Sequence, residues 1–129
     1  NVMLTERDEF IYDEMITHVP MAIHKEAKDI LVIGAGDGGV VRELTRYDRV
    51  SHIDLVEMDP MVVEACRAYL PGNACRLDDR RVHLHYENAL KYIRRCENKY
   101  DLIIVDSRIP LAHRRDYLPV NFTETAIMR

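Results

Sequence analysis

The sequence predicts an α/β fold in which helices flank a parallel β-sheet. Short, largely apolar segments at residues 30–33, 53–56, 82–86 and 100–106 have the length and composition of strands. Segments with helical periodicity lie between them, and this alternation is typical of a parallel sheet with helical crossovers. A glycine-rich turn follows the first of these strands, as in many ligand-binding folds of this class. We therefore expect right-handed crossovers and a sheet of about four parallel strands.

The segment before the first strand predicts an amphipathic helix over residues 6–17. Thr5 and Asp8 have the spacing of a capping box, although Glu or Gln is usual at the second position. Apolar residues recur at helical spacing: Phe10, Ile11, Met15, Ile16 and Val19. Pro20 marks the expected end of this helix or the start of a second short turn, and residues 21–23 continue the apolar face.

Residues 30–39 are the centre of the prediction, because four apolar residues run directly into the glycine turn. Gly34, Gly36 and Gly39 have the spacing G-x-G-x-x-G. Glycines at these positions permit a tight turn and let backbone N–H groups approach a ligand. The helix expected over residues 39–46 points its positive end toward the turn.

Glu57 ends the second predicted strand and stands 21 residues after Gly36. An acid at this distance is the usual partner of a ribose hydroxyl pair. Strand, glycine turn, helix, strand and acid in this order predict a nucleoside site. Asp37, inside the turn, would repel a pyrophosphate and suits a positively charged ligand. The combination favours a sulfonium nucleoside related to S-adenosylmethionine over NAD.

The remaining elements continue the alternation of strand and helix. Asp59 and Pro60 start a helix, and residues 71–73 end it. Its expected inner face comprises Met61, Val62, Ala65, Cys66 and Leu70. A strand, a turn at residues 87–89, a helix over residues 90–96 and a last strand follow. The groups after the strands are the glycine turn, Glu57, Asn88 and Asp106. They mark the carboxyl edge of the sheet, where open α/β folds bind ligands.

Composition argues against several other classes. The 129 residues suit one domain, and the formal net charge of −4 disfavours a nucleic-acid partner. No apolar run reaches the roughly 20 residues of a membrane span, and no secretory signal is visible. The cysteines Cys66, Cys75 and Cys96 are predicted to be free thiols in a reducing cytoplasm. His83 and His85 alternate on a predicted strand, but two ligands do not make a metal site, so we expect packing or surface roles for them.

Several stretches in combination resemble the spermidine synthase family of polyamine aminopropyltransferases. They are Thr5-Glu-Arg-Asp-Glu-Phe-Ile-Tyr-Asp-Glu-Met15, His18-Val-Pro20, Val32-Ile-Gly-Ala-Gly-Asp-Gly-Gly39, Val56-Glu-Met-Asp59, Tyr69-Leu-Pro71, Asp78-Asp79 and residues 100–107. The resemblance implies a Rossmann-like sheet of the S-adenosylmethionine-dependent methyltransferase type, incomplete in this chain. Residues 1–107 would be the N-terminal part of the catalytic domain. The family's N-terminal β-strand domain and the second half of its sheet have no counterpart, so we expect truncation at both ends.

The resemblance also implies a reaction. Decarboxylated S-adenosylmethionine would donate its aminopropyl group to a polyamine, usually putrescine, giving spermidine and methylthioadenosine without metal or redox cofactor. Asp106 becomes the general base. The implied nucleoside-binding residues are Gly34, Gly36, Asp37, Glu57, Asn88 and Ala89, with Glu57 on the ribose and Asn88 and Ala89 beside the adenine. The implied polyamine-binding residues are Tyr12, Asp13 and Asp37. Family members are often homodimers or homotetramers.

The chain departs from the family pattern at defined places. The family usually has His where Asp13 stands, and Asp where Asn88 stands. The largest departure is residues 108–129, which lack the family's Thr-Asp-Pro-x-Gly-Pro and carry Ile109 in place of the second aspartate. Back-translation with permitted codons in a shifted frame restores Asp-Pro-Ile-Gly-Pro, so our hypothesis is that this tail is frameshifted. A DNA sequence without a family-like second frame would contradict it. Such a tail would leave the fourth strand with an exposed edge.

Other functions remain open alternatives. A small-molecule S-adenosylmethionine-dependent methyltransferase shares the glycine turn and the acid, and preference for the intact over the decarboxylated nucleoside would identify it. A non-catalytic nucleoside-binding remnant fits the missing half-sheet and the missing second aspartate, and it would make this chain inactive. An NAD-dependent dehydrogenase is disfavoured by Asp37.

Overall fold

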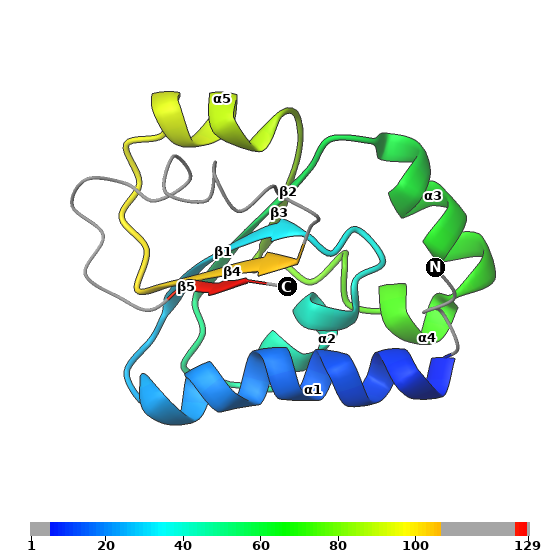
Figure 1. Ribbon diagram of the computed structural model, residues 1–129, viewed down its shortest axis with the longest axis horizontal. Coiled ribbons are helices and arrows are strands. Elements are labelled where there is room, and N and C mark those ends of the chain that lie inside the picture. Colours follow the sequence, from blue (N-terminus) through cyan, green and yellow to red (C-terminus); the bar gives the residue numbers. More distant parts are fainter. Residues whose placement is uncertain (1–5, 107–125, 129) are drawn as a thin grey trace.

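A computed structural model describes residues 6–106 and 126–128 of the chain, and the side chains of residues 11–106. Its centre is a parallel sheet in the order β3-β2-β1-β4-β5 (Figure 1). The strands are β1 Asp29–Gly34, β2 His52–Glu57, β3 Val82–Tyr86, β4 Leu102–Asp106 and β5 Ala126–Met128. The predicted α/β class and the four predicted parallel strands are confirmed.

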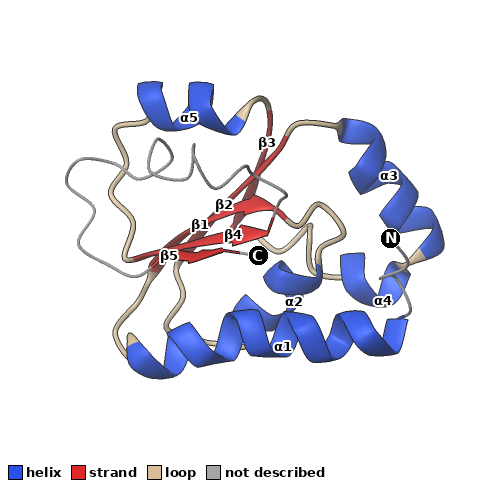
Figure 2. Ribbon diagram, viewed as in Figure 1, coloured by secondary structure: helices blue, strands red, loops and turns tan. Residues whose placement is uncertain are grey.

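Helices cover both faces of the sheet (Figure 2). They are α1 Glu6–Ile23, α2 Gly39–Leu44, α3 Pro60–Tyr69, α4 Pro71–Ala74 and α5 Ala89–Arg95. Helices α1 and α2 lie on one face and α5 lies on the other. The result is a three-layer arrangement. The helices pack on the faces of the sheet, and the carboxyl ends of its strands lie along one edge.

The core is divided by the sheet into two clusters, because alternate residues of a strand point to opposite faces. Ile30 and Val32 of β1 pack with Val41 of α2 on the first face. Leu31 of the same strand packs with Tyr92 of α5 on the second. All these side chains are almost fully excluded from solvent. The central strands are therefore apolar on both sides, as the run at residues 30–33 predicts.

Helix α1 extends beyond its predicted end. It continues through Pro20 to Ile23, and the His24 N–H donates to the Pro20 carbonyl at 2.9 Å. A proline inside a helix removes one backbone hydrogen bond. Contacts of α1 with α2 and burial of Pro20 and Met21 offset that loss.

The buried face of α1 also differs from the prediction. Its buried members are Asp13, Ile16, Thr17, Pro20 and Met21. The i, i+3, i+4 spacing is helical, as expected, but the face includes two polar residues. Ile11, Met15 and Val19, which the periodicity assigned to the apolar face, are more than half exposed at 54%, 63% and 52%.

Helix α3 begins as predicted, because the Asp59 carboxylate accepts the Met61 N–H at 2.9 Å and Pro60 occupies the first turn. Its predicted inner face is wrong, since Val63 is the buried residue of this helix and Met61 is 72% exposed. The chain after α3 forms the short helix α4 instead of the predicted turn. Pro71 starts α4, where its missing N–H costs nothing.

The sheet has one strand more than predicted. β5 pairs in parallel with β4, with Ile104 opposite Ile127. We expected this edge of β4 to be exposed. Instead, the backbone of β5 forms hydrogen bonds with it. Residues 108–125, on which the frameshift hypothesis chiefly rests, lie outside the described residues, and that hypothesis stays a prediction.

Three further observations concern the described part of the chain. None of its helices combines the length and the apolarity that crossing a membrane requires. Cys66, Cys75 and Cys96 are free thiols, as predicted. Within residues 6–106 and 126–128, no group of three or more His, Cys, Asp or Glu side chains is arranged to hold a metal ion.

Candidate active site

Three residues of the glycine turn that follows β1 have positive φ angles. Gly34 has φ 79°, Ala35 has φ 56°, and Gly38, which precedes α2, has φ 88°. These are left-handed conformations, which glycine adopts without the steric penalty of a Cβ atom. A Cβ on Gly38 would also lie 2.8 Å from the Asn73 carbonyl oxygen. The turn is thus folded tightly against α4.

Glu57 lies directly against this turn. A Cβ on Gly36 would lie 3.0 Å from both Cγ and Oε2 of Glu57, so the missing side chain makes room for the carboxylate. The Asp59 N–H donates to Glu57 Oε1 at 3.3 Å. Burial raises the pKa of Glu57, and backbone hydrogen bonds from Asp59 and Gly36 act in the opposite direction. The predicted pairing of glycine turn and acid is present in the structure.

Asp37 is held at the start of α2. Its Oδ1 accepts the Gly39 N–H at 3.4 Å, and its Oδ2 accepts the Asn73 side-chain amide at 3.2 Å. Both oxygens retain a lone pair for another donor. Asp37 is half-buried, so its carboxylate is partly open to solvent and can accept further hydrogen bonds.

Asp106 ends β4 beside the glycine turn. In the parallel register it is the partner of Gly34, the last residue of β1. Neighbouring strands lie about 5 Å apart, so the Asp106 backbone is adjacent to the start of the turn. The half-buried Asp106 therefore stands at the same edge as Glu57 and Asp37.

Asn88 and Ala89 follow β3 at the same edge. The Asn88 side-chain oxygen accepts the Leu90 N–H at 2.9 Å and the Lys91 N–H at 3.2 Å, which makes Asn88 the N-cap of α5. The Glu87 N–H donates to the Glu57 carbonyl at 3.1 Å and ties this turn to the end of β2. Capping fixes the Asn88 oxygen, so its amide nitrogen is the group that can face a base.

Tyr12 and Asp13 approach from α1. Tyr12 is half-buried and packs against the core cluster that α1 shares with α2. Asp13 is fully buried, and a Cβ on Gly39 would meet its Oδ2 at 1.8 Å. Its Oδ2 also lies 3.7 Å from Nη2 of Arg42. The structure thus brings Asp13 to the first residue of α2, beneath the glycine turn.

Sequence reasoning missed two residues of this region, Arg42 and Asn73. Arg42 is 9% exposed and Asn73 is 1% exposed. The one signal for Arg42 was a charge at the centre of a short apolar helix. Asn73 had none, because residues 71–73 were interpreted as a turn that ends a helix.

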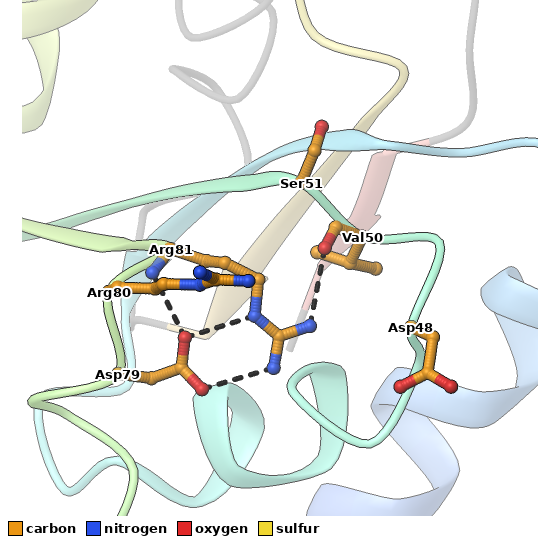
Figure 3. Close-up of a pocket in the computed structure, with 6 residues that line it drawn as sticks. All are labelled: Asp48, Val50, Ser51, Asp79, Arg80 and Arg81. Atoms are coloured by element: carbon orange, nitrogen blue, oxygen red, sulfur yellow. Dashed lines mark hydrogen bonds and ion pairs between the residues drawn. The ribbon is translucent and has the colours of Figure 1, made fainter.

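A hollow of about 930 Å³ lies at the opposite edge of the sheet, before β2 and β3 (Figure 3). Arg81 fills one side of it and donates to Asp79, to the Val50 carbonyl at 3.2 Å and to the Thr45 carbonyl at 2.7 Å. The Arg81 hydrogen bonds lower the pKa of Asp79 to about 2. This arrangement joins loops at the amino ends of the strands. It is remote from the glycine turn, so we assign it a structural role.

The fold defines a Rossmann-like α/β protein in which the glycine turn lies against Glu57 at the carboxyl edge of the sheet. The family model described as "Spermine/spermidine synthase domain" matches residues 9–127. The chain therefore belongs to the spermine/spermidine synthase family.

Relatives and solved structures of this family resemble the chain over most of its length. A polyamine aminopropyltransferase of Lachnoclostridium phytofermentans is 57% identical over 109 residues, which are 84% of this chain and 38% of that protein. A polyamine aminopropyltransferase of Clostridium perfringens is 62% identical with the same coverage. The crystal structure of spermidine synthase from Thermotoga maritima has a TM-score of 0.78 and 46% identity, and covers 86% of this chain and 38% of that one.

A second structure, spermidine synthase in complex with the transition-state analogue AdoDATO, has a TM-score of 0.77 and 46% identity over 81% of this chain and 37% of that one. The chain thus spans little more than a third of the length of the relatives it matches. The resemblance stated from the sequence motifs is confirmed.

Proposed function

We propose that the protein transfers an aminopropyl group from decarboxylated S-adenosylmethionine to putrescine, giving spermidine and methylthioadenosine. Membership of the spermine/spermidine synthase family supports this reaction. The observation that carries the proposal is the contact between Gly36 and Glu57 at the edge where Asp106 ends β4. The transfer needs one carboxylate that binds the ribose, for which we propose Glu57, and a second that accepts a proton from the amine, for which we propose Asp106.

The chemistry follows from the charges of the reactants. A sulfonium makes its neighbouring carbon electrophilic, and methylthioadenosine leaves as a neutral thioether when the C–S bond breaks. The attacking amine forms the new C–N bond, but an alkylamine is protonated at neutral pH and must first lose a proton. Asp106 accepts that proton as general base. Alignment of amine, carbon and sulfur supplies the rest of the acceleration, so no cofactor is required.

The substrate contacts extend this proposal over the site. Glu57 binds the ribose hydroxyls, Gly34 and Gly36 let the nucleoside approach the backbone, and Asn88 and Ala89 face the adenine. Asp37 binds the primary amine of the aminopropyl chain or of the polyamine. Tyr12 and Asp13 contribute to binding of the polyamine. Because Asp13 is fully buried, its negative charge attracts the polyamine cation without direct contact.

The location and assembly of the protein belong to the same proposal. Free thiols at Cys66, Cys75 and Cys96 suit a reducing cytoplasm. Small molecules are its proposed partners, without nucleic acid or membrane. By analogy with the family we propose a homodimer or homotetramer, which sedimentation equilibrium would test.

Nucleoside affinity tests the proposal first. Titration calorimetry with decarboxylated S-adenosylmethionine, methylthioadenosine and intact S-adenosylmethionine is expected to give binding that Glu57→Ala weakens about 10- to 100-fold, because hydrogen bonds to a charged group are lost. Glu64→Ala, on the exposed side of α3, is the matched control. Formation of methylthioadenosine with putrescine then tests transfer. A folded protein that binds none of these nucleosides would contradict the proposal, and preference for the intact nucleoside would favour a methyltransferase.

A further inference from the structure

Asn73 is a buried polar residue that joins a buried cation to the carboxylate in the glycine turn. Its Oδ1 accepts the Arg42 Nη1–H at 2.8 Å. Its Nδ2 donates to Oδ2 of Asp37 at 3.2 Å. With 1% of its surface exposed, the amide has no alternative partner in solvent. The side chain therefore connects α2, α4 and the turn.

The chemistry of the two neighbours fixes which way the amide faces. A guanidinium only donates hydrogen bonds and an ionised carboxylate only accepts them. The Asn73 oxygen must therefore face Arg42, and its nitrogen must face Asp37. Reversal of the amide would place donor against donor and acceptor against acceptor.

Arg42 is itself held from several sides. Its Nε donates to Glu43 Oε2 at 2.9 Å, and Nη1 also reaches the Gly72 carbonyl at 3.3 Å. Its Nη2 lies 3.7 Å from Oδ2 of Asp13 on α1. A buried guanidinium with this many acceptors has one orientation, and it transmits that orientation to Asn73.

The backbone around Asn73 is also fixed against the turn. The Asn73 N–H donates to the Leu70 carbonyl at 3.0 Å. A Cβ on Gly38 would lie 2.8 Å from the Asn73 carbonyl oxygen and 2.9 Å from Cα of Ala74, so α4 and the turn are in backbone contact. The distance from the Asn73 side chain to Asp37 is therefore set by rigid packing.

We propose that Asn73 is a positioning residue that orients the Asp37 carboxylate toward the primary amine of the substrate. The inference rests on the proposed function, which assigns that amine to Asp37. Arg42 orients Asn73, and Asn73 occupies one lone pair of Oδ2 so that the remaining lone pairs of Asp37 face the site. The same chain of contacts links Asp13 on α1 to the amine end of the site.

The test compares one ligand that carries the sulfonium and the aminopropyl chain with a second ligand that lacks both. Decarboxylated S-adenosylmethionine carries the aminopropyl amine, whereas methylthioadenosine has none. In titration calorimetry, Asn73→Ala is expected to weaken binding of the first about tenfold and to leave binding of the second unchanged, since one charge-assisted contact loses its alignment. A residue with a merely structural role would weaken both ligands equally. Cys75→Ser, on the exposed side of the same segment, is the matched control.

Asn73→Asp provides a second variant of the same shape. It keeps an acceptor for Arg42 but places a carboxylate against Asp37, and two facing carboxylates share a proton. The preference for the amine-bearing nucleoside is expected to fall, and to fall further between pH 8 and pH 6, where the wild-type preference stays constant. If Asn73→Ala does not fold, this variant decides the question. If Asn73→Asp prefers decarboxylated S-adenosylmethionine over methylthioadenosine as strongly as wild type does, the proposed role of Asn73 is overturned.

The two failures can be told apart with the unmodified protein. If wild type itself binds methylthioadenosine and the amine-bearing nucleoside equally, the proposed function fails and the role of Asn73 falls with it. If wild type shows the preference and both variants keep it, only the role of Asn73 is overturned.

Discussion

Asp106→Asn is expected to slow aminopropyl transfer by about 10²- to 10⁴-fold, the usual contribution of a general base. An asparagine has the shape of aspartate but cannot accept a proton from the ammonium group of putrescine. Binding of methylthioadenosine requires no proton transfer to Asp106, so its affinity should be unchanged. Single-turnover formation of methylthioadenosine, followed by chromatography, measures the chemical step, and calorimetry measures the binding.

The control for this variant is Asp78→Asn, which removes an exposed carboxylate whose partner, Arg67, lies 3.0 Å away on the surface. Exposed ion pairs of this kind contribute little, so activity should stay at the wild-type level. An Asp106→Asn protein with the wild-type rate would contradict the role of Asp106. A protein that has lost nucleoside binding as well would indicate that Asp106 supports the turn beside Gly34 instead.

Patterns local in the sequence predicted the parts of this site that depend on local geometry. The apolar run at residues 30–33 and the turn after it fix where β1 ends. The spacing from Gly36 to Glu57 follows from one strand, one helix and the next strand. Because the strands are parallel, Asp106 had to lie at the same edge. None of these inferences needed the packing of side chains from distant segments.

The parts that depend on packing between distant segments were not predictable in the same way. Asp13 and Thr17 belong to the buried face of α1, where the periodicity of apolar residues indicated Ile11 and Met15. A search for apolar faces cannot find a face that contains a carboxylate. Asn73 meets Asp37 only because the chain after Pro71 turns into α4 and packs on Gly38. That contact depends on a helix too short to leave a periodic signal.

The hydrogen-bond partners of Asp54 depend on the register between β2 and β3, which the sequence pattern does not predict. Asp54 alternates with Ile53 and Leu55 in β2, which is the ordinary pattern of a strand with one polar position. The pairing of β2 with β3 places His85 opposite Val56 and brings its ring to Asp54. The sequence predicted packing or surface roles for His83 and His85. His83 stacks on His52 with ring centroids 4.5 Å apart.

Asp54→Asn is expected to lower the free energy of unfolding by about 2 kcal/mol at pH 7. Asp54 is 2% exposed. Its Oδ1 accepts His85 Nε2–H at 2.8 Å, and its Oδ2 accepts His52 Nε2–H at 2.9 Å and the Tyr100 hydroxyl at 2.6 Å. Burial raises the pKa of Asp54, but the hydrogen bonds from Tyr100, His85 and His52 outweigh it and lower the pKa to about 2.

Because the pKa of Asp54 is lower in the folded state than in the unfolded state, its ionised carboxylate stabilises the fold. A carboxyl group with a lowered pKa in the folded state stabilises the protein above its unfolded pKa of 3.8. The contribution is lost as pH falls through the folded value of about 2. A shift from 3.8 to about 2 corresponds to about 2 kcal/mol at 1.36 kcal/mol per pKa unit. An asparagine brings a donor to a place where His52, His85, Tyr100 and the Asn98 amide all donate, so this stabilisation is removed at neutral pH.

Urea unfolding followed by circular dichroism at pH 7, 5 and 3 measures the effect. The difference between wild type and Asp54→Asn should stay near its full value at pH 7 and 5 and shrink at pH 3, because the wild-type protein then begins to lose the same stabilisation. Asp78→Asn, with a carboxylate that is 80% exposed, should stay within about 0.5 kcal/mol of wild type. A difference for Asp54→Asn that does not change with pH would mean that packing around Tyr100, and not the charge of Asp54, stabilises this face of the sheet.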